Sequence, residues 1–179
     1  MRTTLILGGA RSGKSRYAEE LASNVCGAVL FVATAEPGDE EMQKRIEAHR
    51  RNRPMFWQTL EATENVGSQI TENIGAAQTV IIDCITLLVS NVLLKHENEP
   101  DEVVEKAVTD ETDGLIECTG SSEANFIIVS NEVGLGLVPA DPLSRRYRDL
   151  LGRVNQALAQ HADEVVMLVA GLPVTVKKG

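Results

Sequence analysis

A glycine-rich segment near the start of the sequence carries a pattern that binds phosphate. In LILGGARSGKSRYAEELA, residues 5–22, the spacing G-x-x-x-x-G-K-[ST] is filled by Gly8, Gly13, Lys14 and Ser15. Glycines let backbone N–H groups turn inward around a phosphate, the lysine reaches the outer phosphates, and the serine hydroxyl binds Mg²⁺. The alternative is an ordinary strand-to-helix turn with an exposed lysine. The apolar run before the pattern and the helical spacing after it favour a nucleotide-phosphate loop.

A carboxylate for the metal side of such a site ends the run TVIID, residues 79–83. Ligands of open α/β sheets bind at the carboxyl ends of strands, which is where this run places Asp83. Taken alone, such an acid is about as often a turn or a helix cap. With the phosphate loop expected on a neighbouring strand, a Mg²⁺ role is favoured. The sequence has no N-K-x-D guanine-reading element, so a GTP-driven switch is not indicated. A small-molecule kinase and a non-catalytic nucleotide-binding module stay open.

One histidine lies among arginines in DEEMQKRIEAHRRNR, residues 39–53. Acids in the first turn, bases in the last and Pro54 as a stop predict a helix, with Met42, Ile46 and His49 on or beside its inward face. Spacing alone favours a half-buried histidine beside a solvated basic helix end. The alternative is an imidazole nucleophile toward phosphorus, with arginines stabilising charge on a triphosphate under attack.

Short, nearly continuous apolar runs predict the strands that would position these groups. Such runs suit strands covered on both faces, and helical spacing between them indicates an α/β fold with a mostly parallel sheet. Residues 143–158 show one apolar stripe, a helix is expected near 101–117, and 172–177 would add an edge strand. No linker divides residues 1–179, which predicts a single domain. The apolar runs lie at residues 4–7, 29–34, 79–83, 125–130 and 164–171.

Composition excludes several classes of protein. The net charge is -9, but residues 97–117 hold nine acids against one base, so the rest of the chain is nearly balanced and nucleic-acid binding is not indicated. Aromatic residues are only 3%, too few for a base-stacking platform. Cys26, Cys84 and Cys118 are too few and too widely spaced for a disulfide framework or zinc knuckle. No signal-peptide core or membrane span is present, and we expect a cytoplasmic protein.

Beyond these patterns, the sequence resembles the bifunctional adenosylcobinamide kinase/adenosylcobinamide-phosphate guanylyltransferase family of cobalamin biosynthesis. The likeness covers nearly the whole chain, from GGARSGKSRYAE to LSRRYRDLLGRVNQALAQHADEVVMLVAG. Its most specific parts are SNEVGLGLVP, GRVNQ and the histidine of RIEAHR. In the acidic region 95–117 we find no family motif, and no function is assigned to it.

The resemblance implies a two-step activity and a RecA-like P-loop fold. Such enzymes phosphorylate adenosylcobinamide with ATP or GTP, then transfer GMP from GTP to adenosylcobinamide phosphate, giving adenosylcobinamide-GDP and pyrophosphate. The second step would run through a guanylylated histidine, here His49. A homotrimer is implied by analogy.

The resemblance also implies a set of nucleotide contacts. Without it, Glu61 would be taken as a surface acid on a short strand. Asn131 and Glu132 begin a loop at a strand's carboxyl end, where they could face the same crevice or form a turn. Lys14 and His49 are the expected catalytic residues, and Ser15 and Asp83 the Mg²⁺ ligands. The expected GTP contacts are Gly8, Gly9, Ala10, Arg11, Ser12, Gly13, Lys14, Ser15, Thr34, Ala35, Glu36, Arg50, Arg51, Asn52, Arg53, Glu61 and Asp83.

Overall fold

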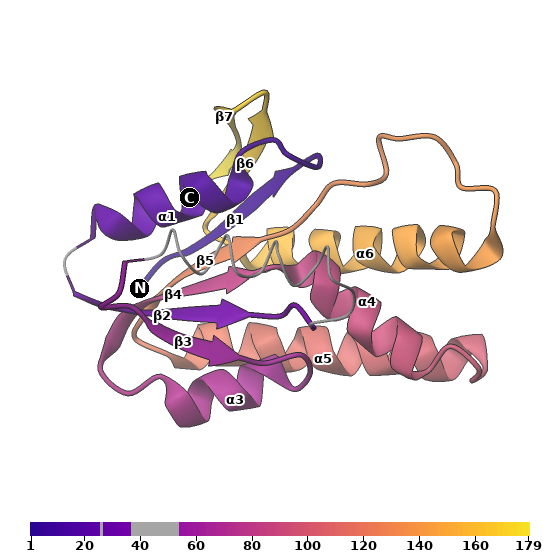
Figure 1. The fold of residues 1–179 in the computed structure, drawn as a ribbon, viewed down its shortest axis with the longest axis horizontal. Helices are drawn as coiled ribbons and strands as arrows, with labels where there is room; N and C mark the ends of the chain where they lie inside the picture. Colours follow the sequence, from indigo (N-terminus) through magenta and orange to yellow (C-terminus); the bar gives the residue numbers. More distant parts are fainter. Residues whose placement is uncertain (26, 37–53) are drawn as a thin grey trace.

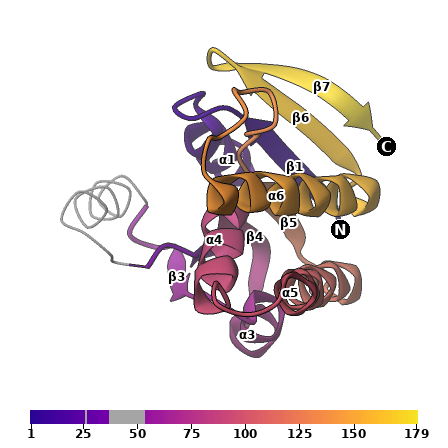
Figure 2. The same cartoon turned by 90° about the vertical axis from the view of Figure 1, so that its right-hand side faces the viewer.

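The computed structural model describes residues 1–25, 27–36 and 54–179, and these form one seven-stranded sheet with helices on both faces (Figure 1). The strand order is β3-β2-β4-β5-β1-β6-β7. All neighbours pair in parallel except β6 and β7, which form an antiparallel hairpin at one edge (Figure 2). The strands are β1 (Thr3–Gly8), β2 (Ala28–Ala33), β3 (Gln58–Glu61), β4 (Ala77–Asp83), β5 (Asn125–Val129), β6 (Glu164–Val169) and β7 (Leu172–Lys178).

Two hydrophobic clusters, one on each face of the sheet, explain why the strand sequences are almost continuously apolar. Along β2, Leu30 and Val32 belong to one cluster, whereas Val29 and Phe31 belong to the other. Successive side chains of a strand point to opposite faces, so a strand covered on both faces needs apolar residues at every position.

Helix α1 packs on one face and the other described helices pack on the opposite face, as Figure 1 shows for α1 relative to α3 and α5. Helix α6 begins with Pro142 behind the N-cap Asp141, whose side chain accepts a 2.8 Å hydrogen bond from the Ser144 N–H. The helices are α1 (Lys14–Ser23), α3 (Val66–Asn73), α4 (Ile85–Lys95), α5 (Asp101–Ser121) and α6 (Pro142–His161).

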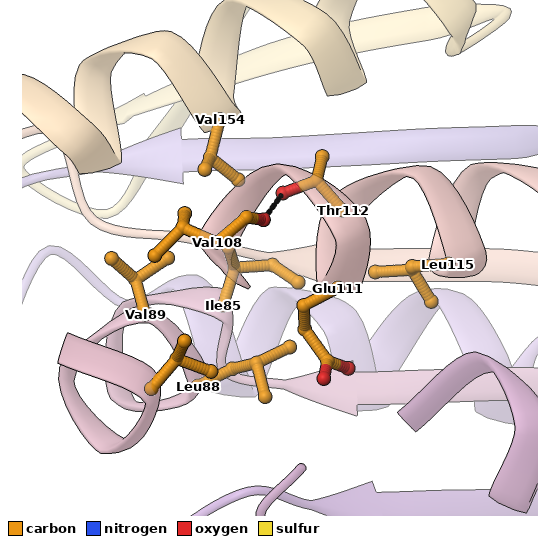
Figure 3. A pocket seen from close by; sticks show the side chains of 9 residues that line it. Ile85, Leu88, Val89, Val108, Glu111, Thr112, Leu115 and Val154 are labelled. Atoms are coloured by element: carbon orange, nitrogen blue, oxygen red, sulfur yellow. Dashed lines mark hydrogen bonds between the residues drawn. The ribbon is translucent and has the colours of Figure 1, made fainter. Parts of the chain in front are cut away.

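Where α4, α5 and α6 meet, apolar side chains enclose a small cavity (Figure 3). Its walls include Leu88 and Val89 of α4, Leu115 of α5 and Val154 of α6. The cavity volume is about 10 Å³, roughly the space of one water molecule. It is therefore a packing gap in the core and not a ligand site.

The predicted strands and the predicted helices at 101–117 and 143–158 are confirmed, and α5 extends four residues further, to Ser121. One expectation was wrong: β5 lies between β1 and β4, so the strand of the phosphate loop and the strand of Asp83 are not neighbours. The predicted helix at 39–53 lies outside the described residues, as does Cys26. Within the described residues, no helix combines the length and apolar composition needed to cross a membrane.

Candidate nucleotide-binding site

The carboxyl ends of the parallel strands meet at one edge of the sheet and bring candidate residues together from distant parts of the sequence. In the strand register Glu61 stands opposite Ala33, Ala33 opposite Asp83, and Asp83 opposite Val129. β1 runs alongside β5 and ends at Gly8, where the phosphate loop begins. This edge is where open α/β sheets bind their ligands.

The backbone of the loop needs glycine at both ends of the pattern. Gly8 has φ 153° and a Cβ there would lie 2.7 Å from the Leu168 carbonyl oxygen and 2.7 Å from Ser12 Oγ. Gly13 has φ 95°, a left-handed conformation, and is the N-cap of α1. A Cβ would obstruct the first position and strain the second. The loop thus leads directly into α1, and because the first N–H groups of a helix have no partner within that helix, this is the usual geometry of an anion site.

Lys14 is a buried cation at this edge. It is 7% exposed, and its Nζ donates a 2.7 Å hydrogen bond to the Gly9 carbonyl oxygen. Burial lowers the pKa of the Lys14 amine, while the nearby Cys84 and Asp83 act in the opposite direction and raise it. The amine of the loop therefore lies within electrostatic reach of the carboxylate at the end of β4, although β5 separates the two strands.

The other residues of the loop differ in exposure. Gly9, Ala10 and Arg11 are exposed, and Ser12 and Ser15 are half-buried. Ser12 Oγ is buried without a hydrogen-bond partner among the described residues. A bound phosphate would supply an acceptor for such a hydroxyl.

Thr34, which we expected to contact GTP, has a structural use for its side chain. It is fully buried, and its hydroxyl donates to the Cys84 carbonyl oxygen at 2.7 Å and accepts from the Cys84 N–H at 2.8 Å. Asn91 of α4 donates to the Thr34 carbonyl oxygen at 2.9 Å and to that of Thr63 at 3.2 Å. These bonds join the end of β2 to Cys84, the residue after Asp83, and join the segments after β2 and β3 to α4. A direct contact between the Thr34 hydroxyl and a nucleotide stays a prediction.

The remaining candidates divide between the sheet edge and the part of the chain outside the description. Ala35 is half-buried just after β2, and Glu36 and Glu61 are exposed at the same edge. Asp83 is half-buried. The expected nucleophile and the four residues after it, His49, Arg50, Arg51, Asn52 and Arg53, lie outside the described residues.

The loop after β5 also lies against the phosphate loop. The Glu132 N–H donates a 3.0 Å hydrogen bond to the Gly8 carbonyl oxygen, and a Glu132 carboxylate oxygen accepts from the Gly134 N–H at 2.6 Å. Glu132 thus shapes a turn with its side chain while its backbone contacts the site. Sequence reasoning singled out Asn131 and Glu132 but missed Thr86 and Asn155, which bind the backbone beside them. Their only signal was membership of motifs, since a buried polar side chain has no periodic signature.

Comparison with known proteins gives the same picture over almost the whole chain. The family model "Cobinamide kinase / cobinamide phosphate guanyltransferase" matches residues 4–176. The chain is 41% identical to the bifunctional adenosylcobalamin biosynthesis protein CobU of Salmonella typhimurium, over 97% of this chain and 98% of that protein. It is 43% identical to the bifunctional adenosylcobalamin biosynthesis protein CobP of Pseudomonas aeruginosa, over 97% of this chain and 96% of that protein.

Solved structures show the likeness of the fold. The assembled ATPase EscN of the enteropathogenic E. coli type III secretion system superposes with a TM-score of 0.58 at 12% identity, over 94% of this chain and 43% of that chain. A Pyrococcus horikoshii protein, PH0250, superposes with a TM-score of 0.55 at 9% identity, over 99% of this chain and 86% of that chain. At these identities only the fold is shared, and the expected RecA-like α/β fold is confirmed. By the match of the family model and the identity to its bifunctional relatives, this chain belongs to the cobinamide kinase / cobinamide phosphate guanyltransferase family.

Proposed function

We propose that this chain carries out both reactions named by its family. It first transfers the γ-phosphoryl group of ATP or GTP to the aminopropanol hydroxyl of adenosylcobinamide. It then transfers GMP from GTP to adenosylcobinamide phosphate, giving adenosylcobinamide-GDP and pyrophosphate. The observation that carries the proposal is the phosphate loop with the buried Lys14 at the carboxyl edge of the sheet, in a chain matched to this family over residues 4–176.

The phosphate loop and the start of α1 would bind the triphosphate. Lys14 Nζ would exchange its hydrogen bond to the Gly9 carbonyl oxygen for bonds to the β and γ phosphates. The backbone N–H groups between Gly8 and Ser15 and the positive end of the α1 dipole would hold the same anions. Because Lys14 is largely buried, its charge is poorly screened by water and acts strongly on developing charge in the transition state.

Magnesium is implied by the phosphate-loop chemistry, and the side chains at this edge fit it. Ser15 and Asp83 would hold the ion, which supplies neutralisation of phosphate charge when bound. Among the described residues, no group of three or more His, Cys, Asp or Glu side chains could hold a metal ion. That agrees with Mg²⁺, which typically takes one or two protein ligands and completes its octahedron with phosphates and water.

Guanylyl transfer would use His49 as a nucleophile, in two displacements that each conserve atoms and charge. A neutral imidazole nitrogen attacks the α phosphorus of GTP, the N–P bond forms, and the bond to the β-phosphate oxygen breaks to release pyrophosphate. A phosphate oxygen of adenosylcobinamide phosphate then attacks the same phosphorus, and the N–P bond breaks to return the free imidazole. Arg50, Arg51 and Arg53 follow the nucleophile and would stabilise the negative charge.

Further parts of the proposal rest on the resemblance alone. Thr34, Ala35, Glu36 and Glu61 would contact GTP from the ends of β2 and β3, and Asn52 would do so beside the nucleophile. A homotrimer, one domain over residues 1–179 and a cytoplasmic location are likewise predictions.

An assay of both half-reactions tests this function. The purified protein is incubated with adenosylcobinamide, Mg²⁺ and ATP, then with GTP, and the corrinoid products are identified by mass spectrometry while pyrophosphate is measured. We expect the phosphorylated corrinoid after ATP and the GDP-linked corrinoid after GTP. Phosphorylation without GMP transfer would reduce the protein to a small-molecule kinase. Absence of both products would refute the proposal.

A further inference from the structure

A buried amide on α6 is bonded to the loop that lies against the phosphate loop. Asn155 is 5% exposed and is the polar member of the buried stripe of α6, among Leu151, Val154 and Leu158. An amide buried among apolar side chains costs free energy unless its donor and acceptor groups are satisfied. An amide at this position therefore needs hydrogen-bond partners, and a leucine in its place could not form those bonds.

Both ends of the Asn155 amide form hydrogen bonds, and both partners lie directly after β5. Its Oδ1 accepts a 2.7 Å hydrogen bond from the Ser130 hydroxyl, and its Nδ2 donates at 3.0 Å to the Asn131 carbonyl oxygen. Ser130 is itself fully buried. The amide thus fixes two successive residues just past the last strand position.

Helix α4 holds the same residue, Asn131, through its N–H group. The Asn131 N–H donates at 2.8 Å to Thr86 Oγ1, and the Thr86 carbonyl oxygen accepts a 3.1 Å hydrogen bond from the Tyr147 hydroxyl of α6. Asn131 is therefore held at its N–H by α4 and at its carbonyl by α6. Rotation of the peptide plane on either side of Asn131 would therefore break one of these two partly buried hydrogen bonds.

The next residue, Glu132, bonds this segment to the phosphate loop. The Glu132 N–H donates at 3.0 Å to the carbonyl oxygen of Gly8, the residue with which the phosphate loop begins. One residue earlier, the Ser130 N–H donates at 2.9 Å to the Ile6 carbonyl oxygen. The end of β5 is thus bonded to β1 on both sides of Asn131.

We propose that Asn155 is a positioning residue for nucleotide binding, which acts by holding the Asn131–Glu132 backbone against Gly8 and so pre-organises the phosphate loop. Loss of the amide lets this backbone move, and the loop must then be ordered when the triphosphate binds. Ordering a group on binding weakens affinity. The inference rests on the proposed nucleotide site, and it assigns a function to the GRVNQ motif that the phosphate-loop pattern does not contain.

The test compares Asn155→Leu with a variant that loses a buried hydroxyl without touching this loop. The control is Thr112→Val, because Thr112 is 6% exposed and its hydroxyl donates at 2.7 Å to the Val108 carbonyl oxygen of its own helix (Figure 3). The Kd of the α,β-methylene analogue of GTP, which cannot transfer its GMP group, is measured in Mg²⁺ by calorimetry at a temperature well below both unfolding midpoints. In parallel, the KM for nucleotide and kcat of the kinase reaction are compared.

We expect Asn155→Leu to weaken GTP binding about tenfold or more and to raise the KM for nucleotide more than it lowers kcat, since a disordered loop costs ordering entropy. The Kd of Thr112→Val should stay within about twofold of that of the unsubstituted protein, even if its unfolding midpoint falls as much as that of Asn155→Leu. A folded Asn155→Leu with unchanged Kd and KM would overturn the inference. If that variant does not fold, Thr86→Val, which removes the acceptor for the Asn131 N–H, decides by the same criterion.

Failure of the inference and failure of the proposed function give different results. If the unsubstituted protein binds no GTP, the nucleotide site itself is wrong. If it binds GTP and the folded Asn155→Leu variant binds equally well, or Thr86→Val does so where Asn155→Leu does not fold, only the positioning role is wrong.

Discussion

The Lys14 amine is largely buried, donates a hydrogen bond to the Gly9 carbonyl oxygen and lies near Cys84 and Asp83. Because burial lowers its pKa from 10.5, the folded state binds fewer protons than the unfolded state between the two pKa values, so this group's contribution to stability rises with pH in that window. We predict that Lys14→Met lowers the rates of both half-reactions about 100-fold or more, because it removes a positive charge that stabilises the transition state. Its unfolding midpoint should stay within a few degrees, because the lost hydrogen bond is offset by relief of desolvation. Steady-state kinetics and calorimetry check both, and near-normal turnover would contradict the assigned role.

Cys84 follows Asp83 directly at the same edge and is half-buried. Burial, followed by the charge of Asp83, raises the pKa of its thiol from 9.0 to about 11. A shift of this size lowers the thiolate fraction about 100-fold at neutral pH. We predict that iodoacetamide at pH 8 alkylates Cys84 about 100-fold more slowly in the folded protein than in the same chain unfolded in urea. Peptide mass spectrometry measures both rates, and equal rates would contradict the raised pKa of this thiol.

At the scale of elements, the close contact between α3 and α5 requires a glycine, Gly67, on α3. A Cβ on Gly67 would lie 2.3 Å from the Gly114 carbonyl oxygen, whereas a Cβ on Gly114 would meet nothing within 4 Å. We predict that Gly67→Ala lowers the free energy of unfolding by about 2 kcal/mol or more, through overpacking. Gly114→Ala should leave it unchanged or raise it by up to about 1 kcal/mol, because alanine favours a helix interior. Urea titrations measure both, and equal effects would contradict the close packing of these helices.

Most of the strands could be predicted from the sequence, because strands covered on both faces leave continuous apolar runs. Helix α4 was not predicted: ITLLVSNVLLK is apolar nearly all round, with six of its residues buried, so it lacks the polar face on which periodicity depends. The strand order was not predictable either. Nothing local in the run 125–130 shows that it inserts between β1 and β4. Both of these neighbouring strands are distant from it in the sequence.

Some residues of the candidate site could likewise be predicted from the sequence, whereas others could be found only from the fold. Gly8 to Ser15 could be found from spacing, since a phosphate loop fixes its residue types locally. The proximity of Asp83 to Lys14 required the fold, and the bonds of Thr34, Asn91 and Asn155 required side-chain positions. These polar groups bind backbone atoms of other elements, and such pairs have no fixed sequence separation.

At the scale of the whole molecule, strands from both ends of the sequence are interleaved in one sheet. β1, from the start of the sequence, lies between β5 and β6 and so joins strands β2 to β5 to the hairpin of β6 and β7. We predict a single cooperative unfolding transition in urea. Trp57, the one tryptophan in the sequence, is 7% exposed beside β3, so its fluorescence reports one edge while far-UV circular dichroism reports all elements. The two midpoints should coincide, and an earlier fluorescence transition would show that the β3 edge unfolds separately.

The central claim is that a nucleotide held at this sheet edge transfers its GMP group to the enzyme before it reaches the corrinoid. The most direct measurement incubates the protein with α-labelled GTP and Mg²⁺, denatures it and counts the label that stays with the chain. We predict retained label that acid releases, because a phosphoramidate on histidine is acid-labile. It should be absent from His49→Ala, strongly reduced in Lys14→Met, and mapped by peptide analysis to His49. Full labelling of His49→Ala, or no label on a protein that makes the GDP-linked corrinoid, would contradict the account.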